Sequence, residues 1–235
     1  MLLEFIDFHC HFLSSNAIYC TAQPVSRQAL PIQQQPFLYC EGLLPQYWTA
    51  QKQEMLVHNL QAPASILRPH HFGEVNLGEV GLDKRFQAHV SLQEQEENLL
   101  ALLKEAKRLD KLVTIHSVQA TERTINVLMK AQLKPWKTIW HGFNGSLETA
   151  QILYKLGVFI SLGPRSIGPR VPKQDLKALA KVHPNFVLET DYEGADQTQY
   201  NNLLQEHYQN CATQLGWSLE KLKEHCYGQA QTLTN

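Results

Sequence analysis

The sequence predicts an α/β protein that folds as a (β/α)8 TIM barrel in a single domain, residues 1–235, with its early helices reduced or missing. Two observations lead to this expectation: eight short apolar runs lie along the chain, and helical patterns follow most of them. Strands that alternate with helices in this way form parallel βα units that close into a barrel. The length of 235 residues suits one such domain, and the 43% of residues that are apolar can fill its core.

The expected strands are short and mostly apolar, as strands are when both faces of a parallel sheet are buried. They are Glu4–Phe8, Ala17–Thr21, Phe37–Glu41, Val75–Gly78, Leu112–Ile115, Thr138–Trp140, Val158–Ser161 and Phe186–Glu189. In a barrel of parallel strands the carboxyl ends of all the strands meet at one face, where active sites form.

The expected helices carry apolar residues at helical spacing. They are Ser91–Leu109, Thr121–Ala131, Ser146–Leu156, Lys173–Val182, Gln197–Leu215 and Ser218–Gln231. Ser146 can cap the start of its helix, and Gly157 can follow the end of the same helix. Pro184 stops the helix that ends at Val182, because proline cannot continue a helix.

The N-terminal part lacks such patterns. Phe12–Asn16 is too short for a crossover helix, and Gln23–Pro36 contains three prolines and several glutamines, which is typical of a loop. The first two helices of the barrel are therefore expected to be missing or reduced.

Composition narrows the class of protein. The net charge is −1, so the chain has no overall positive field of the kind that coats nucleic acid. Five cysteines at irregular spacing predict neither a disulfide framework nor a Cys-x-x-Cys zinc site, and they favour a reduced, cytoplasmic protein. No signal peptide and no membrane span is expected, because no apolar run reaches about 18 residues. Nothing in the sequence identifies a protein partner.

Six residues of the kinds that bind divalent metals lie at the ends of these apolar runs. They are His9, His11, Glu79, His116, His141 and Asp191. Each has an ordinary alternative by itself, such as a hydrogen-bonded core histidine or an acid that caps a helix or turn. Because five strand ends would place all six at one face of the barrel, we expect one shared site for one or two metal ions.

Local sequence explains how three of these residues would face the site. His9 and His11 are separated by one residue, so both imidazoles point to one side of an extended strand. Asp7 is expected to orient one of the two imidazoles. Glu79 lies between Gly78 and Gly81, whose flexible backbone lets the carboxylate enter the barrel mouth and bridge two ions.

The order and surroundings of these residues resemble the TatD family of metal-dependent hydrolases, which belongs to the amidohydrolase superfamily. The resemblance covers nearly the whole chain. It rests on the segments Asp7–Phe12, Gly78–Asp83, Ile115–Ser117, His141–Ser146 and Glu189–Asp191. The second and fourth of these segments are quite specific to the family, whereas His-x-His is shared with many metallohydrolases.

The resemblance implies a DNase-like hydrolase that carries one or two divalent ions, with zinc, manganese, magnesium and nickel as the candidates. The implied ligands are His9, His11 and Asp191 for one ion and His116 and His141 for the other, with Glu79 as the bridge. Glu79 and Asp191 would be the catalytic carboxylates, with Asp191 as the base toward an attacking water. The ions would activate that water and neutralise phosphate oxygens.

The chain departs from the family pattern at three places. Leu44 and Gln46 stand where the family has two histidines, and Val118 stands where an arginine is common. The segment Tyr192–Asp196 replaces one that contains proline. These differences bear on the expected substrate rather than on the metal ligands.

Four basic residues are candidate contacts for a substrate phosphate, with solvated surface charge as the alternative. They are Arg165, Arg170, Lys84 and Arg85. The expected substrate is DNA or a small phosphoester. Hydrolysis of another ester or amide on the same site, or a degenerate barrel retained for binding, are the alternatives, because fold alone does not select among them.

Overall fold

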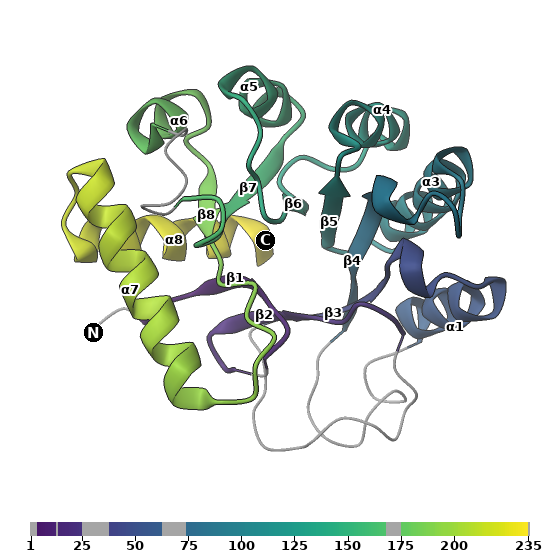
Figure 1. The fold of residues 1–235 in the computed structure, drawn as a ribbon, viewed down its shortest axis with the longest axis horizontal. Coiled ribbons are helices and arrows are strands. Elements are labelled where there is room, and N and C mark those ends of the chain that lie inside the picture. The colour runs from purple at the N-terminus through teal and green to yellow at the C-terminus, as the bar shows by residue number, and fades with distance from the viewer. Residues whose placement is uncertain (1–3, 13, 25–37, 63–73, 168–174, 235) are drawn as a thin grey trace.

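The computed structural model describes residues 4–12, 14–24, 38–62, 74–167 and 175–234. Its eight strands are all parallel and pair in sequence order, β1 to β8, in one sheet. The sheet curls into a nearly closed barrel with helices around its outside (Figure 1). The expected (β/α)8 architecture is confirmed.

Most strands begin and end close to the expected residues. They are β1 Asp7–Cys10, β2 Ala17–Cys20, β3 Leu38–Leu43, β4 Val75–Asp83, β5 Val113–Val118, β6 Thr138–Trp140, β7 Val158–Leu162 and β8 Phe186–Leu188. The main correction is to β4, which continues through the Gly-Glu-Val-Gly segment to Asp83 and is buried along its whole length. Glu79 therefore lies inside this strand rather than after its end.

The helices form an outer layer around the barrel (Figure 1). They are α1 Ala50–Gln61, α3 Leu92–Arg108, α4 Thr121–Ala131, α5 Leu147–Lys155, α6 Leu176–Val182, α7 Gln197–Leu215 and α8 Leu219–Thr234. Two short 3-10 helices, η1 Pro45–Tyr47 and η2 Lys84–Phe86, follow β3 and β4. Ser146 caps α5 as expected, since its hydroxyl accepts a hydrogen bond from the N–H of Thr149.

No helix is predicted from the sequence over residues 50–61, where the structure has α1. Leu56 and Leu60 are buried there, but Asn59 is buried between them. Asn59 Nδ2 donates to Glu41 Oε2 on β3 at 2.6 Å. Asn59 and Glu41 thus form a buried polar pair at a position where an amphipathic helix usually has an apolar residue. The polar residue interrupts the apolar periodicity from which a helix is predicted.

The described residues at the start of the barrel show a reduced helical layer, as expected. The link from β1 to β2 spans residues 11–16, and its described residues form no helix. The expected loop Gln23–Pro36 lies mostly outside the described residues. Among the described helices, none is long and apolar enough to cross a membrane.

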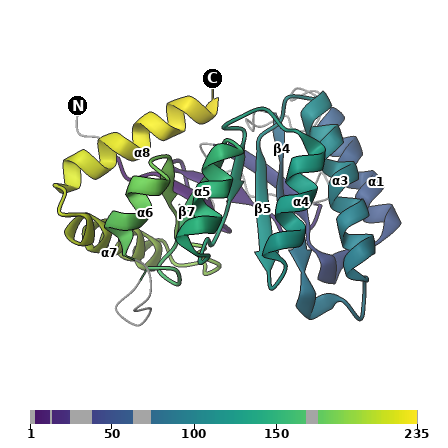
Figure 2. The ribbon, with the colours of Figure 1, turned by 90° about the horizontal axis from the view of Figure 1, so that it is seen from above.

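Helix α8 lies across the end of the barrel where the strands begin (Figure 2). Its His225 Nε2 donates to the carbonyl oxygen of Phe186, at the start of β8, at 2.8 Å. The ammonium of Lys223 lies 4.3 Å from the ring centre of Phe5, just before β1. α8 therefore covers part of this end, whereas the opposite end, where the strands finish, is the usual place of a site in such a barrel.

Hydrogen bonds between β1 and the segment after β8 close the barrel. The N–H of Asp191 donates to the carbonyl oxygen of His9 at 3.0 Å, and the N–H of His11 donates to that of Tyr192 at 3.0 Å. These bonds place Asp191 directly beside the two histidines.

Gly81 is the closest point of approach between β4 and β5. A Cβ added to Gly81 would lie 1.8 Å from the carbonyl oxygen of His116. That atom belongs to backbone, so we expect Gly81→Ala to destabilise the protein by about 3 kcal/mol, the upper end of ordinary overpacking. Thermal melting should show a fall of about 6–12 °C for a chain of this size.

The control is Gly228→Ala on α8, where an added Cβ meets nothing within 4 Å. Alanine favours a helix over glycine, so this variant should melt at or slightly above the wild-type temperature. A Gly81→Ala protein that melts with the wild type would show that β4 and β5 lie further apart than described.

Candidate metal centre

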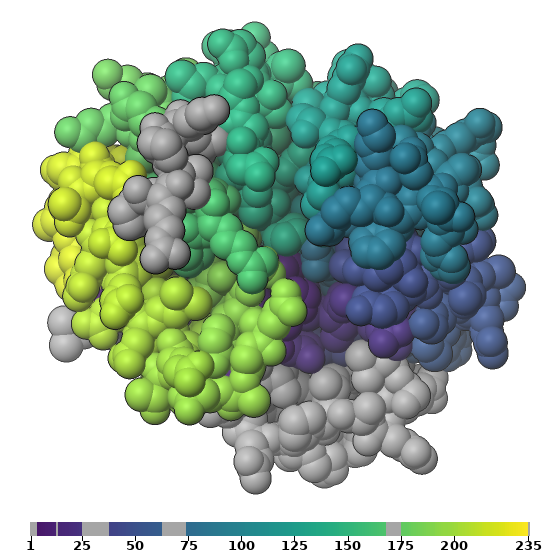
Figure 3. All heavy atoms as spheres, in the orientation of Figure 1, coloured from purple at the N-terminus to yellow at the C-terminus, as the bar shows by residue number. Residues whose placement is uncertain are grey.

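The six predicted ligands converge at the end of the barrel where the strands finish. Each comes from β1, β4 or β5 or from the residues that directly follow β1, β6 and β8. Figure 3 shows this face, with the purple atoms of the first strands visible at its centre between the yellow-green segment after β8 and the blue atoms of the segment after β3. The shared site expected from the sequence is therefore geometrically possible.

Four of the donor atoms form one group. His9 Nε2 lies 3.7 Å from Asp191 Oδ1 and 3.9 Å from Glu79 Oε2. His11 Nε2 lies 3.6 Å and 3.7 Å from the same two oxygens. These separations are too long for hydrogen bonds. They suit donors that share one ion, because two ligands about 2.1 Å from a tetrahedral ion lie roughly 3.4 Å apart.

His9 gives a direct test of whether an ion fits this group. Its side chain is fully buried, yet neither ring nitrogen has a hydrogen-bond partner. An unpaired buried polar group is costly, by about 1–3 kcal/mol. A cation among His9, His11 and Asp191 would give Nε2 the missing partner, so the residues present fit a divalent metal.

A second, tighter group surrounds the other oxygen of Glu79. His116 Nδ1 lies 2.5 Å and His141 Nε2 lies 2.6 Å from Glu79 Oε1. The two ring nitrogens are 3.2 Å apart. The two distances to Oε1 are hydrogen-bond distances, shorter than the roughly 3.4 Å between two ligands of one ion. Glu79 faces the first group with Oε2 and the second group with Oε1, the two directions that a bridging carboxylate needs.

Two of the histidines have hydrogen-bond partners that fix which nitrogen faces the site, and a third lies near a carboxylate. His11 Nδ1 donates to the carbonyl oxygen of Cys20 at 2.8 Å, and His116 Nε2 donates to Asp83 Oδ2 at 3.1 Å. Carbonyl and carboxylate oxygens only accept, so the outer nitrogen of each of these two rings carries a proton and the inner nitrogen is the one directed at the site. His141 Nδ1 lies 3.8 Å from Glu189 Oε1, which also accepts from the N–H of Gly142 at 2.8 Å.

Asp83 and Glu189 are thus site residues that the sequence analysis did not single out. Both lie in the segments Gly78–Asp83 and Glu189–Asp191 that carry the family resemblance. Their sequence signal is a buried carboxylate beside a candidate ligand. That signal gives no direction for the side chain, so only the structure pairs each acid with its histidine.

Asp7 has a different role from the expected one. Its Oδ1 accepts from the backbone N–H groups of His9 and Thr190, and its Oδ2 accepts from the Thr190 hydroxyl at 2.6 Å. It therefore orients backbone at the junction of β1 and β8, rather than an imidazole. Burial raises the pKa of Asp7 to about 7, despite the hydrogen bonds from Thr190 and His9 that lower it.

Burial and mutual charge set the protonation of the centre. Burial lowers the pKa of His9 well below its ordinary value, and the charge of His141 lowers it further. Burial alone would raise the pKa of Glu79, but the charge and hydrogen bonds of His141 and His116 hold it well below its usual range. The pKa of Asp191 is likewise lowered, since nearby histidine rings outweigh its burial. The two carboxylates are therefore charged at neutral pH.

Asp191 has an unusual backbone. Its φ is 51°, in the left-handed region, where Asp and Asn are tolerated better than most residues. Its side chain is one-fifth exposed, at 20%, so it reaches the open mouth.

The predicted phosphate contacts differ in their exposure and in their partners. Arg165 Nη1 lies 3.3 Å from Asp191 Oδ2, with its side chain 80% exposed at the mouth. Lys84 is exposed in η2. Arg85 is also exposed in η2, and its guanidinium binds the carboxylate of Asp83. Arg170 lies outside the described residues.

The positions that depart from the family pattern border the same end of the barrel. Leu44 is buried directly after β3, and Gln46 lies in η1. Tyr192 contacts the ring of Phe12, with ring centres 5.7 Å apart, and its hydroxyl donates to the carbonyl oxygen of Asp196. The Tyr192 side chain thus links the start of the loop after Asp191 to the end of that loop at Asp196.

A family model described as TatD related DNase matches residues 18–235, a range that begins after His9 and His11. A metal-dependent hydrolase of Escherichia coli K12, YjjV, is 28% identical over 218 residues, covering 81% of this chain and 80% of that protein.

Solved structures share the fold. The crystal structure of YJJV, described as a TatD homolog from Escherichia coli K12, superposes with a TM-score of 0.70 at 21% identity, covering 99% of this chain and 98% of that one. A hydrolase TatD family protein from Entamoeba histolytica gives a TM-score of 0.62 at 14% identity, covering 83% of this chain and 74% of that one.

Proposed function

The chain belongs to the TatD related DNase family, and from that premise we propose that it is a metal-dependent hydrolase that cleaves phosphodiester bonds of DNA. The observation that carries the proposal is the pair of unpaired nitrogens on fully buried His9, at the centre of a ring of acids and histidines. An unpaired buried nitrogen is costly, and a bound cation would supply the missing partner.

We assign the ligands by the two groups in the structure. His9, His11 and Asp191 would hold one ion, and His116 and His141 would hold the other. Glu79 would serve both, one oxygen to each group. Divalent ions bound there would lower the pKa of water and neutralise charge on phosphate oxygens.

Asp191 is the proposed base. It is charged at neutral pH, it reaches the mouth, and its Oδ1 lies among the nitrogens of the first group. A proton taken from an attacking water would pass to this carboxylate. Arg165 stands beside Asp191 Oδ2 with most of its side chain in solvent, so its guanidinium can meet an incoming phosphate.

The proposed cellular location and the source of attraction for DNA follow from the cysteines and the net charge. The five cysteines are all free and buried, which favours a reducing compartment, so we propose a cytoplasmic location. With a net charge of −1, attraction of DNA would have to come from the mouth rather than from the whole surface.

The test combines metal analysis with a substrate screen. Purified protein should contain one to two equivalents of a divalent ion, and it should cleave single-stranded or duplex DNA with a rate that a chelator abolishes and added ion restores. Turnover of a small phosphoester, ester or amide without any DNA cleavage would favour the alternative hydrolase. A purified protein that takes up no divalent ion would contradict both metal-dependent hydrolase hypotheses and favour a barrel used for binding.

A further inference from the structure

His116, one of the proposed ligands, is held by a side chain outside the metal centre. Its two ring nitrogens face opposite ways, with Nδ1 toward Glu79 and His141 and Nε2 toward Asp83. The Asp83 carboxylate only accepts, so Nε2 keeps a proton toward Asp83, and Nδ1, which lies 2.5 Å from Glu79 Oε1, is the nitrogen that would bind an ion in place of its own proton.

Asp83 is in turn held by Arg85, which was a candidate contact for substrate. Oδ1 of Asp83 accepts from the backbone N–H and from Nε of Arg85, both at 2.9 Å, and Oδ2 accepts from Nη2 at 2.5 Å. The Asp83 side chain is fully buried, whereas that of Arg85 is 54% exposed. The guanidinium therefore closes the outer side of Asp83 and leaves Oδ2 directed at His116.

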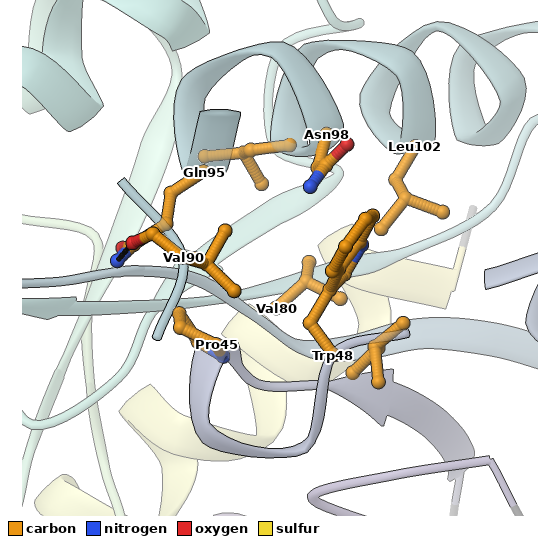
Figure 4. Close-up of a pocket in the computed structure, with 10 residues that line it drawn as sticks. Pro45, Trp48, Val80, Val90, Gln95, Asn98 and Leu102 are labelled. Carbon is orange, nitrogen blue, oxygen red and sulfur yellow. Dashed lines mark hydrogen bonds between the residues drawn. The ribbon is translucent and has the colours of Figure 1, made fainter. Parts of the chain in front are cut away.

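The backbone of Asp83 is fixed from a second side. Buried Gln95, in the first turn of α3, accepts from the N–H of Asp83 at 2.9 Å and donates to its carbonyl oxygen at 3.2 Å. The same amide donates to the carbonyl oxygen of Val90 at 2.8 Å, and Figure 4 shows Gln95 lying beside Val90 at one edge of a cavity lined mainly by apolar side chains. A residue clamped at both backbone and side chain can hold a neighbouring ring in one position.

We propose that Asp83, held by Arg85, fixes the tautomer and direction of His116 and thereby sets the affinity for the ion bound by His116 and His141. Asp83 and Arg85 are positioning residues, and Arg85 acts through Asp83 rather than on the substrate. The inference rests on the proposed metal centre. It differs from a substrate role because it requires an effect on ion binding when no substrate is present.

The experiment titrates metal-free protein with Zn²⁺ by calorimetry and with Co²⁺ by visible absorption. Asp83→Asn should weaken binding of the ion at His116 by about 10–100-fold, the usual cost of losing an outer partner of a metal-bound histidine. Arg85→Gln should weaken it in the same direction by up to about tenfold, and it should change the Co²⁺ spectrum. Arg85 is exposed, so this variant tests the inference even if Asp83→Asn fails to fold.

Lys84→Gln is the matched control, because Lys84 is the neighbouring exposed cation in η2 and the structure shows no contact between it and Asp83. Its ion affinity and spectrum should equal those of the wild type. If Arg85→Gln raises KM while the affinity and spectrum of the bound ion stay unchanged, Arg85 is a substrate contact and the inference is wrong. Ion affinity that Asp83→Asn leaves unchanged in a folded protein overturns it as well, with the metal centre intact. A wild-type protein that binds neither Zn²⁺ nor Co²⁺ overturns the inference together with the proposed function.

Discussion

Replacing Glu79 by glutamine is expected to abolish binding of one ion, weaken the other, and reduce turnover more than any other single change. Glu79 is the only one of the six proposed ligands whose two oxygens face different groups. Glutamine keeps the shape but removes the charge, and its amide nitrogen would face either the His116 and His141 pair or the His9 and His11 pair. We expect the loss in ion affinity to exceed the roughly 10–100-fold typical of an outer partner. Elemental analysis and steady-state kinetics at saturating metal measure both effects.

Glu41→Gln is the control for this prediction. Glu41 is a second buried glutamate, on β3, hydrogen-bonded by Tyr39 and Asn59 outside the proposed centre. Its replacement should lower the melting temperature without changing the ion content. A Glu79→Gln protein that still holds two ions would contradict the bridging role.

Replacing Asp191 by asparagine is expected to lower kcat by about 10²–10⁴-fold, the usual contribution of a general base, and further if the first ion is lost. Asparagine is the better variant because the backbone at this position has a φ of 51°. Asn adopts that conformation as readily as Asp, so the fold should melt within a degree or two of the wild type. Asp191→Ala would add a destabilisation of about 1–2 kcal/mol from the same backbone, which asparagine avoids.

Asp196→Asn is the matched control, an exposed acid in the same loop. Its side chain caps α7 by accepting from the N–H of Gln199, and asparagine caps a helix about as well as aspartate. Activity and melting should therefore match the wild type. If Asp191→Asn keeps wild-type kcat at several pH values, another group is the base.

Much of the fold could be predicted because its strands are apolar runs separated by capped helices. β6, α4 and α7 have the expected bounds, since clear periodicity or a turn residue marks both of their ends. α1 could not be predicted, because Asn59 breaks its apolar face to bond Glu41. The length of β4 was also missed, since glycines interrupt the apolar run and ordinarily signal a turn.

The identity of the residues in the candidate site was more predictable than the direction and hydrogen-bond partners of their side chains. Parallel strands bring their carboxyl ends to one face, so strand position alone predicts that the six residues lie together. Side-chain direction beyond that depends on tertiary contacts. In the structure Asp7 binds backbone at Thr190 rather than an imidazole, and Arg85, a predicted phosphate contact, also binds Asp83, an ion pair that the sequence does not indicate.

The hydrogen bonds that close the barrel have a consequence for how the protein is made. Asp7 and Thr190 are bonded across 183 positions of sequence, and Asp191 stands opposite His9 only when those bonds exist. A ribosome delivers the two histidines long before it delivers the acid. The nascent chain would therefore carry only part of the proposed metal site for most of its synthesis, and binding of an ion by His9, His11 and Asp191 together would have to follow release of the C-terminal third and formation of these hydrogen bonds.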